Sequence, residues 1–451
     1  MSKKLKTILP SPCLAMNKNK LSLAPKSETI ASTLTTAVLT LYGAQGFTEV
    51  GEAETWSFDG DFLYYKEAGR LQILQSTFKG TYFIDTNETI GFKALGDILT
   101  GASPNGQIVS LENITITSPS GKGDVIRPNS LPVLPDYKEL RVAGAVSYGY
   151  EDSNASYSVT ASGSRELDYI SLGLSTSISI PFNQKNTTFD LGVSINNDTI
   201  ISELFTPKPL VIQKVLAAIS EQPILSRTQK KEVFDFLIGF SQIVDTSSFI
   251  TFLYSYGNQQ GYLTDPYKVI SIVEENTGRL LKHSPEHAVV IYESRPDSKI
   301  TQSVYLGYKK AVGKGVFSFG IRALENSWGI KSSTFDTDII IYLNDTIWIK
   351  PHIRYYQQGS ADFYRPFLSE NQLQSIQGCL QCYASADYRI GKFTATTLGL
   401  ELGFDEDKFS IGIETYQQAI SEPKNKFGEL RKVKLVPDLS TILIRVNFKL
   451  D

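Results

Sequence analysis

The sequence lacks any run of about 18 consecutive apolar residues, which is the length of a short membrane-spanning helix. This absence excludes a helical membrane protein. Only helices and closed barrels satisfy every backbone polar group inside lipid, so a membrane protein with this sequence has to be a β-barrel. The net charge of −3 shows no basic excess that would neutralise phosphates, and nucleic acid is therefore not an expected partner.

Cysteine is also scarce, with three residues in 451, which excludes a disulfide-dense secreted scaffold. Cys13 follows Pro-Ser-Pro and lacks the small residues that precede a lipidated cysteine. Cys379 and Cys382 form a Cys-x-x-Cys pair, but no second pair completes a zinc site and no βαβ context supports a thioredoxin motif. We expect neither metal binding nor redox catalysis at this pair. If the pair has a role, a local disulfide formed in an oxidising compartment is the first alternative, and the sequence leaves that role open.

The N-terminal region resembles a secretory signal. Lys18, Lys20 and Lys26 precede an apolar stretch from Ile30 to Leu41, in the order of a basic segment followed by a hydrophobic one. A disordered N-terminus or a short core helix is the alternative. We assign residues 1–50 to a signal peptide or disordered N-terminus and 51–451 to one further domain.

Aromatic residues are abundant, at 11% with 23 Tyr and 24 Phe, and they favour strands. Many segments alternate apolar and polar residues with a period of two, the weak but repeated signature of transmembrane strands. At the C-terminus, Ile442, Ile444, Val446, Phe448 and Leu450 alternate with Leu443, Arg445, Asn447 and Lys449. The first set would face lipid.

The same period recurs along the chain. Apolar positions within 172–180, 189–195, 317–321, 398–404 and 409–413 alternate with polar or small ones, and Asp405–Asp407 makes the turn between the last two segments. Counting from Trp56 gives about sixteen strands, enough for a barrel with a lumen. The fold class predicted is therefore an all-β, transmembrane antiparallel β-barrel.

Two long segments interrupt this pattern. Ser103–Asp136 is rich in Gly, Pro, Ser and Asn, and Pro266–Lys299 is densely charged; both are typical of extramembrane loops. Leu210–Ile219 has helical periodicity and predicts a short loop helix or a small plug. A soluble β-sandwich or propeller would show similar alternation, but a soluble β-protein of this size usually divides into domains with linkers, which are absent after residue 50.

Several ordered motifs resemble the outer-membrane barrel proteins catalogued as domain of unknown function 3570. They are Leu63–Glu67 with Gly69 and Arg70, Asp97–Gly106 with Thr117–Gly121, Gly261–Lys268, Glu293–Ser298, Arg354–Gln358 with Ala361–Tyr364, and Tyr383–Arg389. The resemblance implies a barrel of the outer membrane of a Gram-negative bacterium, exported by the Sec machinery and inserted by the barrel-assembly machinery, with no established activity. The chain departs from the common pattern in ending at Asp451 instead of an aromatic residue.

Catalytic chemistry has few candidates. A hydrolase would need a histidine beside a serine or carboxylates, and the chain has His283 and His287 in the charged loop and His352 on an alternating strand beside Lys350 and Arg354. No Gly-x-Ser-x-Gly elbow accompanies them, and we expect no enzyme, no metal and no cofactor. Tyr64-Tyr65 and Tyr355-Tyr356 are predicted to belong to the aromatic girdles at the membrane interfaces.

The candidate site residues therefore come from the family-like motifs at strand ends. They are Asp97, Asn105, Asp265, Arg295, Asp297, Arg354, Gln357 and Asp362, and they would pair across the lumen or fix loops. The sequence favours a channel or transport barrel in contact with outer-membrane lipid. The alternatives are a structural or assembly partner with a plugged lumen and, third, an outer-membrane hydrolase.

Overall fold

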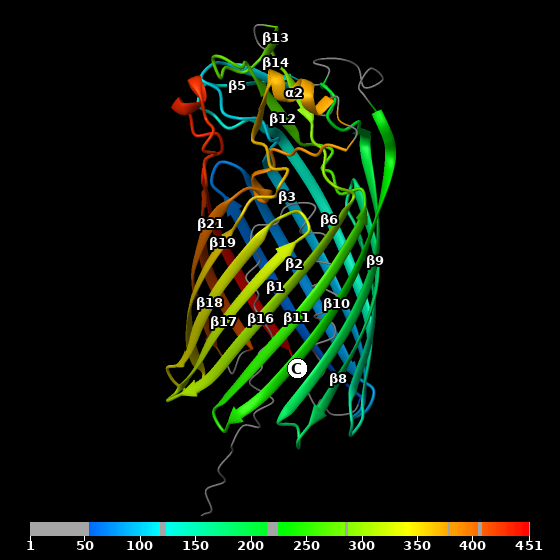
Figure 1. Cartoon of the computed structure of the whole chain (residues 1–451). Helices are drawn as coiled ribbons and strands as arrows, with labels where there is room; N and C mark the ends of the chain where they lie inside the picture. The colour runs from blue at the N-terminus through cyan, green and yellow to red at the C-terminus, as the bar shows by residue number, and fades with distance from the viewer. Residues whose placement is uncertain are drawn as a thin grey trace, which may run out of the picture.

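The main feature of the molecule is a closed barrel (Figure 1). The computed structural model describes residues 54–117, 123–213, 224–284, 287–377, 379, 381–404 and 408–450. Within them, sixteen antiparallel strands form one ring, closed where β1 pairs with β23 and Asp61 lies opposite Asn447. The predicted fold class and strand number are confirmed.

Each strand of the ring pairs with the next barrel strand along the chain. The strands are β1 (Thr55–Glu67), β2 (Leu71–Phe83), β3 (Glu88–Pro104), β6 (Val133–Glu151), β7 (Ser156–Arg165), β8 (Tyr169–Phe182), β9 (Thr187–Pro207), β10 (Ile224–Asp245), β11 (Ser248–Gly261), β16 (Ser298–Val312), β17 (Gly315–Asn326), β18 (Lys331–Tyr342), β19 (Ile347–Gln358), β21 (Phe393–Phe404), β22 (Phe409–Ile420) and β23 (Leu439–Leu450).

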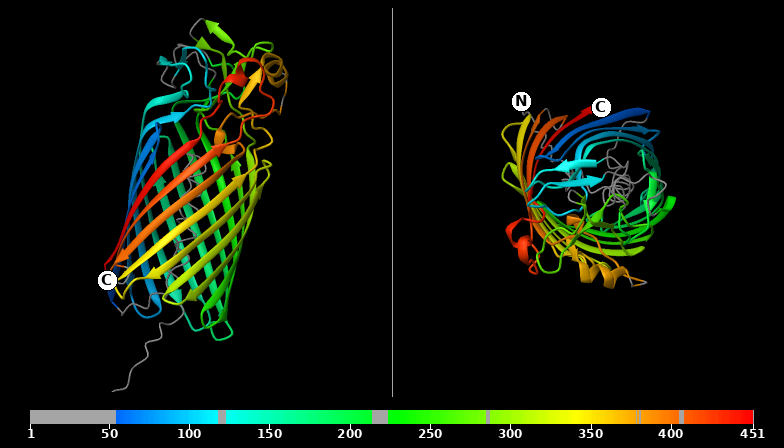
Figure 2. Two further views of the ribbon diagram at one scale, coloured as in Figure 1. Left: turned by 90° about the vertical axis from the view of Figure 1, so that its left-hand side faces the viewer. Right: turned by 90° about the horizontal axis from the view of Figure 1, so that it is seen from above.

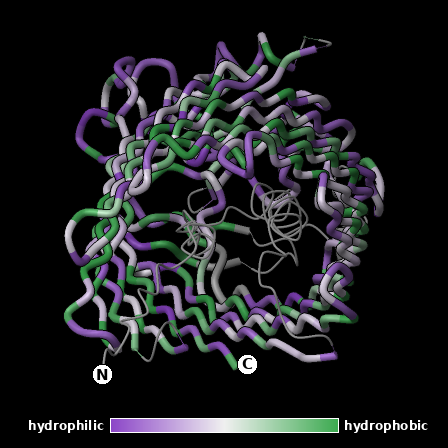
Figure 3. Tube along the Cα trace, turned by 90° about the horizontal axis from the view of Figure 1, so that it is seen from below, coloured by the Kyte–Doolittle hydropathy of each residue, from purple (hydrophilic) through white to green (hydrophobic). Residues whose placement is uncertain are grey.

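The two faces of the strands follow the sequence alternation, because successive side chains of a strand point to opposite sides. Figure 3 shows hydrophobic and hydrophilic positions alternating around the ring. On β23, Ile442 and Leu450 are exposed outside, at 48% and 58%, whereas Leu443 is 5% exposed and faces inward. The outward faces predicted within 172–180, 189–195 and 317–321 are confirmed in the same way by the strand register.

Short turns join the strands at the end of the barrel where β23 terminates. In four of them an Asp or Asn side chain accepts hydrogen bonds from backbone N–H groups two or three residues ahead, which closes the turn. These residues are Asp85, Asp152, Asp245 and Asn344, with N···O distances of 2.6–2.9 Å. The connections at this end of the barrel are therefore short turns.

The other end carries a cap built from the long connections (Figures 1 and 2). The predicted loops Ser103–Asp136 and Pro266–Lys299 both contribute to it, together with 359–392 and 421–438, which the sequence did not single out. Its elements are β4 (Ile114–Thr117), β5 (Gly123–Ile126), β12 (Val269–Val273), β13 (Lys282–Ser284), β14 (His287–Ala288), β15 (Val290–Tyr292), β20 (Phe367–Ser369), α2 (Glu370–Gln377), η3 (Tyr388–Ile390) and η4 (Gly428–Lys432).

The cap has a hydrophobic core of its own. Strands β15, β12 and β20 form one small sheet, and β13, β14, β4 and β5 form another. Ile114, Val273 and Leu435, from three different connections, pack into one buried cluster that also contains Phe393 and Ile420 from the barrel rim. The cap is thus rooted on the inner edge of β21 and β22.

The predicted helix at Leu210–Ile219 is wrong for Leu210–Gln213, and residues 214–219 lie outside the described residues. Leu210 adopts a positive φ of 57°, which ends regular helical geometry. Ile212 instead forms a β-bridge with Ile291, so this segment lies at the edge of the cap sheet. The α-helix in the described part of the chain is α2, and no helix there is long and apolar enough to cross a membrane. The predicted signal region and the Asp405–Asp407 turn also lie outside the described residues.

A charge placed on the outer face tests the orientation of β23. We expect Ile444→Arg to destabilise the barrel by about 2–4 kcal/mol, the cost of an arginine near the bilayer midplane. Asn447→Ser, on the lumen face of the same strand, should cost much less. Reversible urea unfolding in lipid vesicles measures both, and equal costs would contradict the assigned facing.

Candidate functional site

One side of the barrel interior is a wall of paired charges on β18, β19, β21, β22 and β23. Lys350 Nζ lies 2.7 Å from Glu401 Oε2. Asp336 Oδ2 lies 3.2 Å from His352 Nε2 and 2.5 Å from Arg354 Nε. Acids and bases therefore alternate across neighbouring strands, and the wall is close to neutral.

A small hollow of about 40 Å³ opens on this wall. It is open toward the lumen, so it is a shallow recess in the wall. It is lined by Asp336, Asp338, Lys350, His352, Leu400, Glu401, Gly412, Glu414, Leu443 and Arg445. A solute that follows this side of the lumen would meet both signs of charge.

On the facing side of the interior, the inward positions of β8 are uncharged. Strand β21 is eighth after β8 in the ring of sixteen, so the two lie on opposite sides. The inward positions of β8 are Ser171, Gly173, Ser175, Ser177 and Ser179, as predicted. The lumen is thus bordered by short hydroxyl side chains on one side and by charge pairs on the other.

A second cluster of charges ties the cap together. Arg295 Nε lies 2.6 Å from Glu293 Oε1, and Arg295 Nη2 lies 2.8 Å from Asp387 Oδ2. Arg389 also contacts Asp387, and its Nη2 reaches Asp265 Oδ2 at 3.2 Å. Because Arg295, Glu293 and Asp387 are almost fully buried, each charge depends on its partners for compensation.

Burial and charge act in opposite directions in this network. Burial alone would raise the pKa of Asp387, but the positive charges of Arg389 and Arg295 outweigh it and hold that pKa well below its usual range. For Glu293, burial dominates over the attraction of Arg295, and the pKa is raised. Asp387 therefore stays ionised between two arginines, which is what holds η3 against the loop of Arg295.

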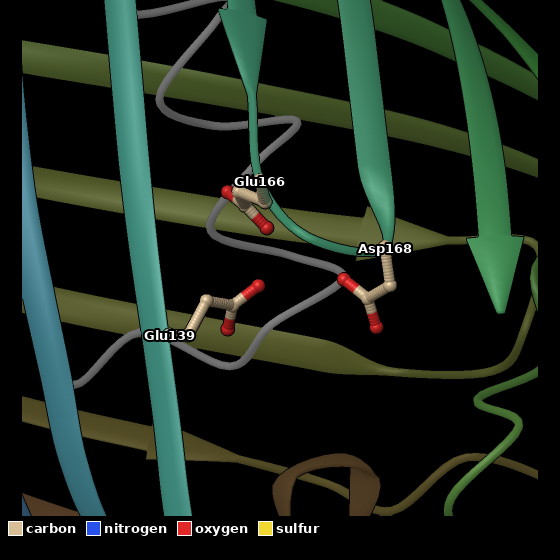
Figure 4. A group of neighbouring side chains, drawn as sticks. All are labelled: Glu139, Glu166 and Asp168. Atoms are coloured by element: carbon tan, nitrogen blue, oxygen red, sulfur yellow. The ribbon is translucent and has the colours of Figure 1, made fainter. Parts of the chain in front are cut away.

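Three carboxylates meet at the cap end of β6, β7 and β8 (Figure 4). One carboxylate oxygen from each of Glu139, Glu166 and Asp168 lies within 4.8 Å of the other two, close enough to share a cation or protons. Asp168 also accepts a hydrogen bond from the Tyr267 hydroxyl of the cap at 2.9 Å. Arg141 Nε lies 3.8 Å from Glu166 Oε1 and supplies positive charge to the group.

Burial raises the pKa of Glu166 to about 7, although Arg141 opposes the shift. Burial likewise raises the pKa of Asp168. Near neutral pH the turn between β7 and β8 thus holds a proton that an exposed carboxylate would have lost.

The candidate residues from the sequence fall into different places. Asp97 forms an ion pair with Arg141 inside the barrel. Asp265 and Arg295 meet in the cap network through Asp387 and Arg389. The other three candidates hold loops of the cap through backbone hydrogen bonds. The backbone oxygen of Asn105 accepts from Val269 N, and that of Asp297 accepts from Gly261 N. The backbone N–H of Asp362 donates to Trp328 O.

Arg354 and Gln357 lie on β19 but on opposite faces. Arg354 joins the charged wall through Asp336, whereas the Gln357 amide donates to Ser333 Oγ on the exterior at 2.9 Å. The sequence missed the partners Glu293, Asp387 and Asp336. Asp387 lies inside the family-like motif Tyr383–Arg389. The nearby Arg389 in that motif was the feature of the sequence that could have marked Asp387 as part of a charge network.

Only one tyrosine of each predicted pair lies on the outer face, where an aromatic girdle would be. Tyr64 and Tyr355 face outward, but Tyr65 and Tyr356 face the interior because neighbours in a strand alternate. Tyr65 donates to Glu67 Oε1 at 2.8 Å, and Tyr356 donates to Gln358 Oε1 at 2.6 Å. The prediction was wrong for the second residue of each pair.

The histidines have ordinary surroundings. His352 faces the lumen, as its alternation indicated, between Asp336 and Glu414. In the cap, Ser284 Oγ lies 2.8 Å from His287 Nδ1, while His287 Nε2 is buried with no partner in the described part of the chain. Cys379 and Cys382 form a disulfide in the cap, which was the alternative role that the sequence left open.

The chain matches, over residues 31–450, the model of the family described as "Protein of unknown function (DUF3570)" and belongs to that family. This confirms the resemblance found in the motifs. No curated protein matches the chain.

Solved barrels resemble the fold at low identity. CdiB from Acinetobacter baumannii is 7% identical with a TM-score of 0.43, over 88% of this chain and 60% of that one. The siderophore receptor PirA from Acinetobacter baumannii is 10% identical with a TM-score of 0.40, over 82% and 53%. OccK11 (OpdR) from Pseudomonas aeruginosa is 8% identical with a TM-score of 0.38, over 90% and 99%. The chain spans between half and two thirds of the length of the first two, and the likeness concerns the fold alone.

Removing one member of the cap network should loosen the cap. Arg295→Met leaves Glu293 and Asp387 buried with less compensation, a loss expected to cost about 3–5 kcal/mol. We expect faster protease cleavage within the cap, with a barrel that still resists denaturing detergent until heated. Arg365→Met is the control, since Arg365 is exposed and donates only to backbone carbonyls. Equal cleavage of both variants would contradict the role of the network.

The Glu166 cluster should make stability depend on pH. A carboxyl whose folded pKa is raised binds more protons when folded, so stability falls as pH rises from 4.5 to about 7. Glu166→Gln should remove that loss. We expect the free energy of unfolding of this variant to exceed that of the unmodified protein by on the order of 1–3 kcal/mol at pH 8, with little difference at pH 4. Urea unfolding at both pH values measures this. Glu325→Gln, exposed on β17, is the control, and a gain independent of pH would contradict the assignment.

Proposed function

We propose that this member of the DUF3570 family lies in the outer membrane and conducts small hydrophilic solutes through its lumen. Its backbone hydrogen bonds close into a ring, and its outward positions are apolar; both features suit a lipid environment. Lipid is the expected surrounding partner, after export by the Sec machinery and insertion by the barrel-assembly machinery. The capped end would face the exterior, because outer-membrane barrels carry their long loops there.

The observation that carries the proposal is the charged wall. Ionisable side chains at membrane depth are costly, and where they occur they mark solute or ion pathways. Lys350, His352 and Arg354 project into the interior from one strand and meet acids of β18, β21 and β22. A lumen needed only for packing would be filled more cheaply by apolar side chains.

The cap favours a second candidate, a barrel whose mouth is closed and whose loops bind another protein. Its buried cluster reaches Phe393 and Ile420 on the inner rim, so the cap is anchored to the wall. A cap held in this way could act as a gate or as a permanent plug. The two roles differ in whether loosening the cap opens a pore.

Catalysis receives less support, and we propose no enzymatic role. His352 faces carboxylates on both sides, and His287 Nε2, on the far side of the ring from the nitrogen that contacts Ser284, has no partner among the described residues. A serine hydrolase needs a base that a third group orients.

Single-channel recording tests the proposal. Protein purified from the outer-membrane fraction is inserted into planar bilayers, alone and as Arg295→Met. Discrete current steps from the unmodified protein support an open channel. Steps only from Arg295→Met support a gated one, because the loosened cap would uncover the mouth.

Silence from both proteins, when each shows heat-modifiable migration, contradicts a channel and supports the plugged role. Absence from the outer-membrane fraction contradicts the proposed location. Arg365→Met again serves as the control, and it should behave like the unmodified protein.

A further inference from the structure

Two opposite charges face each other across one strand of the lumen wall without forming an ion pair. Lys309 lies on β16 and Asp338 on β18, and both are aligned with Ser318 of the intervening strand β17. All three side chains point inward, since residues an odd number of positions away on the same strands, Leu306, Phe319 and Ile341, are exposed on the outer face. The two charges therefore sit at one level of the lumen.

Most charges around them are already engaged. Asp336 forms ion pairs with His352 and Arg354. Lys350 forms an ion pair with Glu401, and Arg445 lies 3.6 Å from Asp61. Among the described residues, the side chains of Lys309 and Asp338 form no ion pair or hydrogen bond. Asp338 nevertheless acts electrostatically on Lys309 and also on Lys350 of β19. Lys309 and Asp338 are thus near enough to attract each other without forming an ion pair.

The strands that carry the two charges set their separation. Two strand spacings separate the backbones of β16 and β18 by about 9–10 Å, and Ser318 between them is short. Asp338 also lines the recess in the charged wall. Gly307 and Gly320 lie beside this level without side chains, and the Tyr305 ring covers them, within 3 Å of where a Cβ would stand on either. Tyr305 thus forms one side of the space between the two charges.

We propose that Lys309 and Asp338 form a binding site for small zwitterions, such as free amino acids or short peptides, on the solute path of the channel proposed above. The carboxylate of the solute would pair with Lys309 and its ammonium group with Asp338. A lone anion would be attracted by Lys309 but repelled by Asp338. A lone cation would be attracted by Asp338 but repelled by Lys309. Complementary charges at two points therefore select a solute that carries both signs.

The experiment measures block of the single-channel current by glycylglycine, with acetate, ethylamine and glycerol as probes of one sign or none. It uses the protein in whichever form conducts, unmodified or Arg295→Met. Glycylglycine should reduce the current at lower concentration than the other three. Asp338→Asn and Lys309→Gln should each weaken this block by roughly two- to fivefold, the range expected for one solvated ion pair.

A charge exchange keeps the test independent of folding damage. The double variant Lys309→Asp with Asp338→Lys retains both signs, and it should restore the block that either single charge reversal abolishes. Asp190→Asn is the matched control, because Asp190 faces the lumen from β9 and accepts from Ser179 Oγ at 2.6 Å. It should leave the block unchanged.

Each outcome has a distinct meaning. Absence of current from every form would overturn the channel, whereas current without preferential block by glycylglycine overturns only the zwitterion site. Acetate blocking as well as glycylglycine, with Lys309→Gln the sole sensitive variant, would show a simple anion site and overturn the proposal. Weakening by Asp190→Asn to the same degree would show a general charge effect and overturn it as well.

Discussion

The structure depends on one constraint, which is that every backbone N–H and C=O group of the membrane-spanning strands needs a partner. The pairing of β1 with β23 meets it by leaving no free edge in the ring of sixteen. Once the ring is closed, side chains have two destinations only, outside or inside. The apolar exterior, the charged wall and the hydroxyl-lined wall all follow from that division.

The cap obeys a different rule. Its connections come from distant parts of the chain and bury a hydrophobic cluster over the barrel rim. In the same layer, Arg295 and Asp387, separated by 92 residues, meet away from water. Buried charges tolerate no loss of a partner. The cap is therefore held by apolar packing that favours compactness and by charges that require each loop to keep its place.

The sequence predicted the features that are local. Alternation over a few residues located the strands, the outward face of β23 and the serine-rich inner face of β8, because the period of two is a property of the extended chain. Turn chemistry and composition located the loops at Ser103–Asp136 and Pro266–Lys299. The same kind of local pattern predicted a helix that is wrong for Leu210–Gln213, where Ile212 pairs with Ile291 at the edge of the cap sheet. It also assigned Tyr65 and Tyr356 to the girdle, since aromatic content was considered without strand parity.

The sequence by itself determined the barrel, its approximate strand number and which residues face in or out. Only the tertiary structure decided which inward charges meet. Arg354 belongs to the charged wall, Asp97 pairs with Arg141 on another side of the barrel interior, and Arg295 belongs to the cap network, although all three lie in family-like motifs. The gap between Lys309 and Asp338 depends on the register of three strands. Facing is set by neighbours along one chain, but the pairing of charges is set by neighbours across strands and loops, and a single sequence does not state their register.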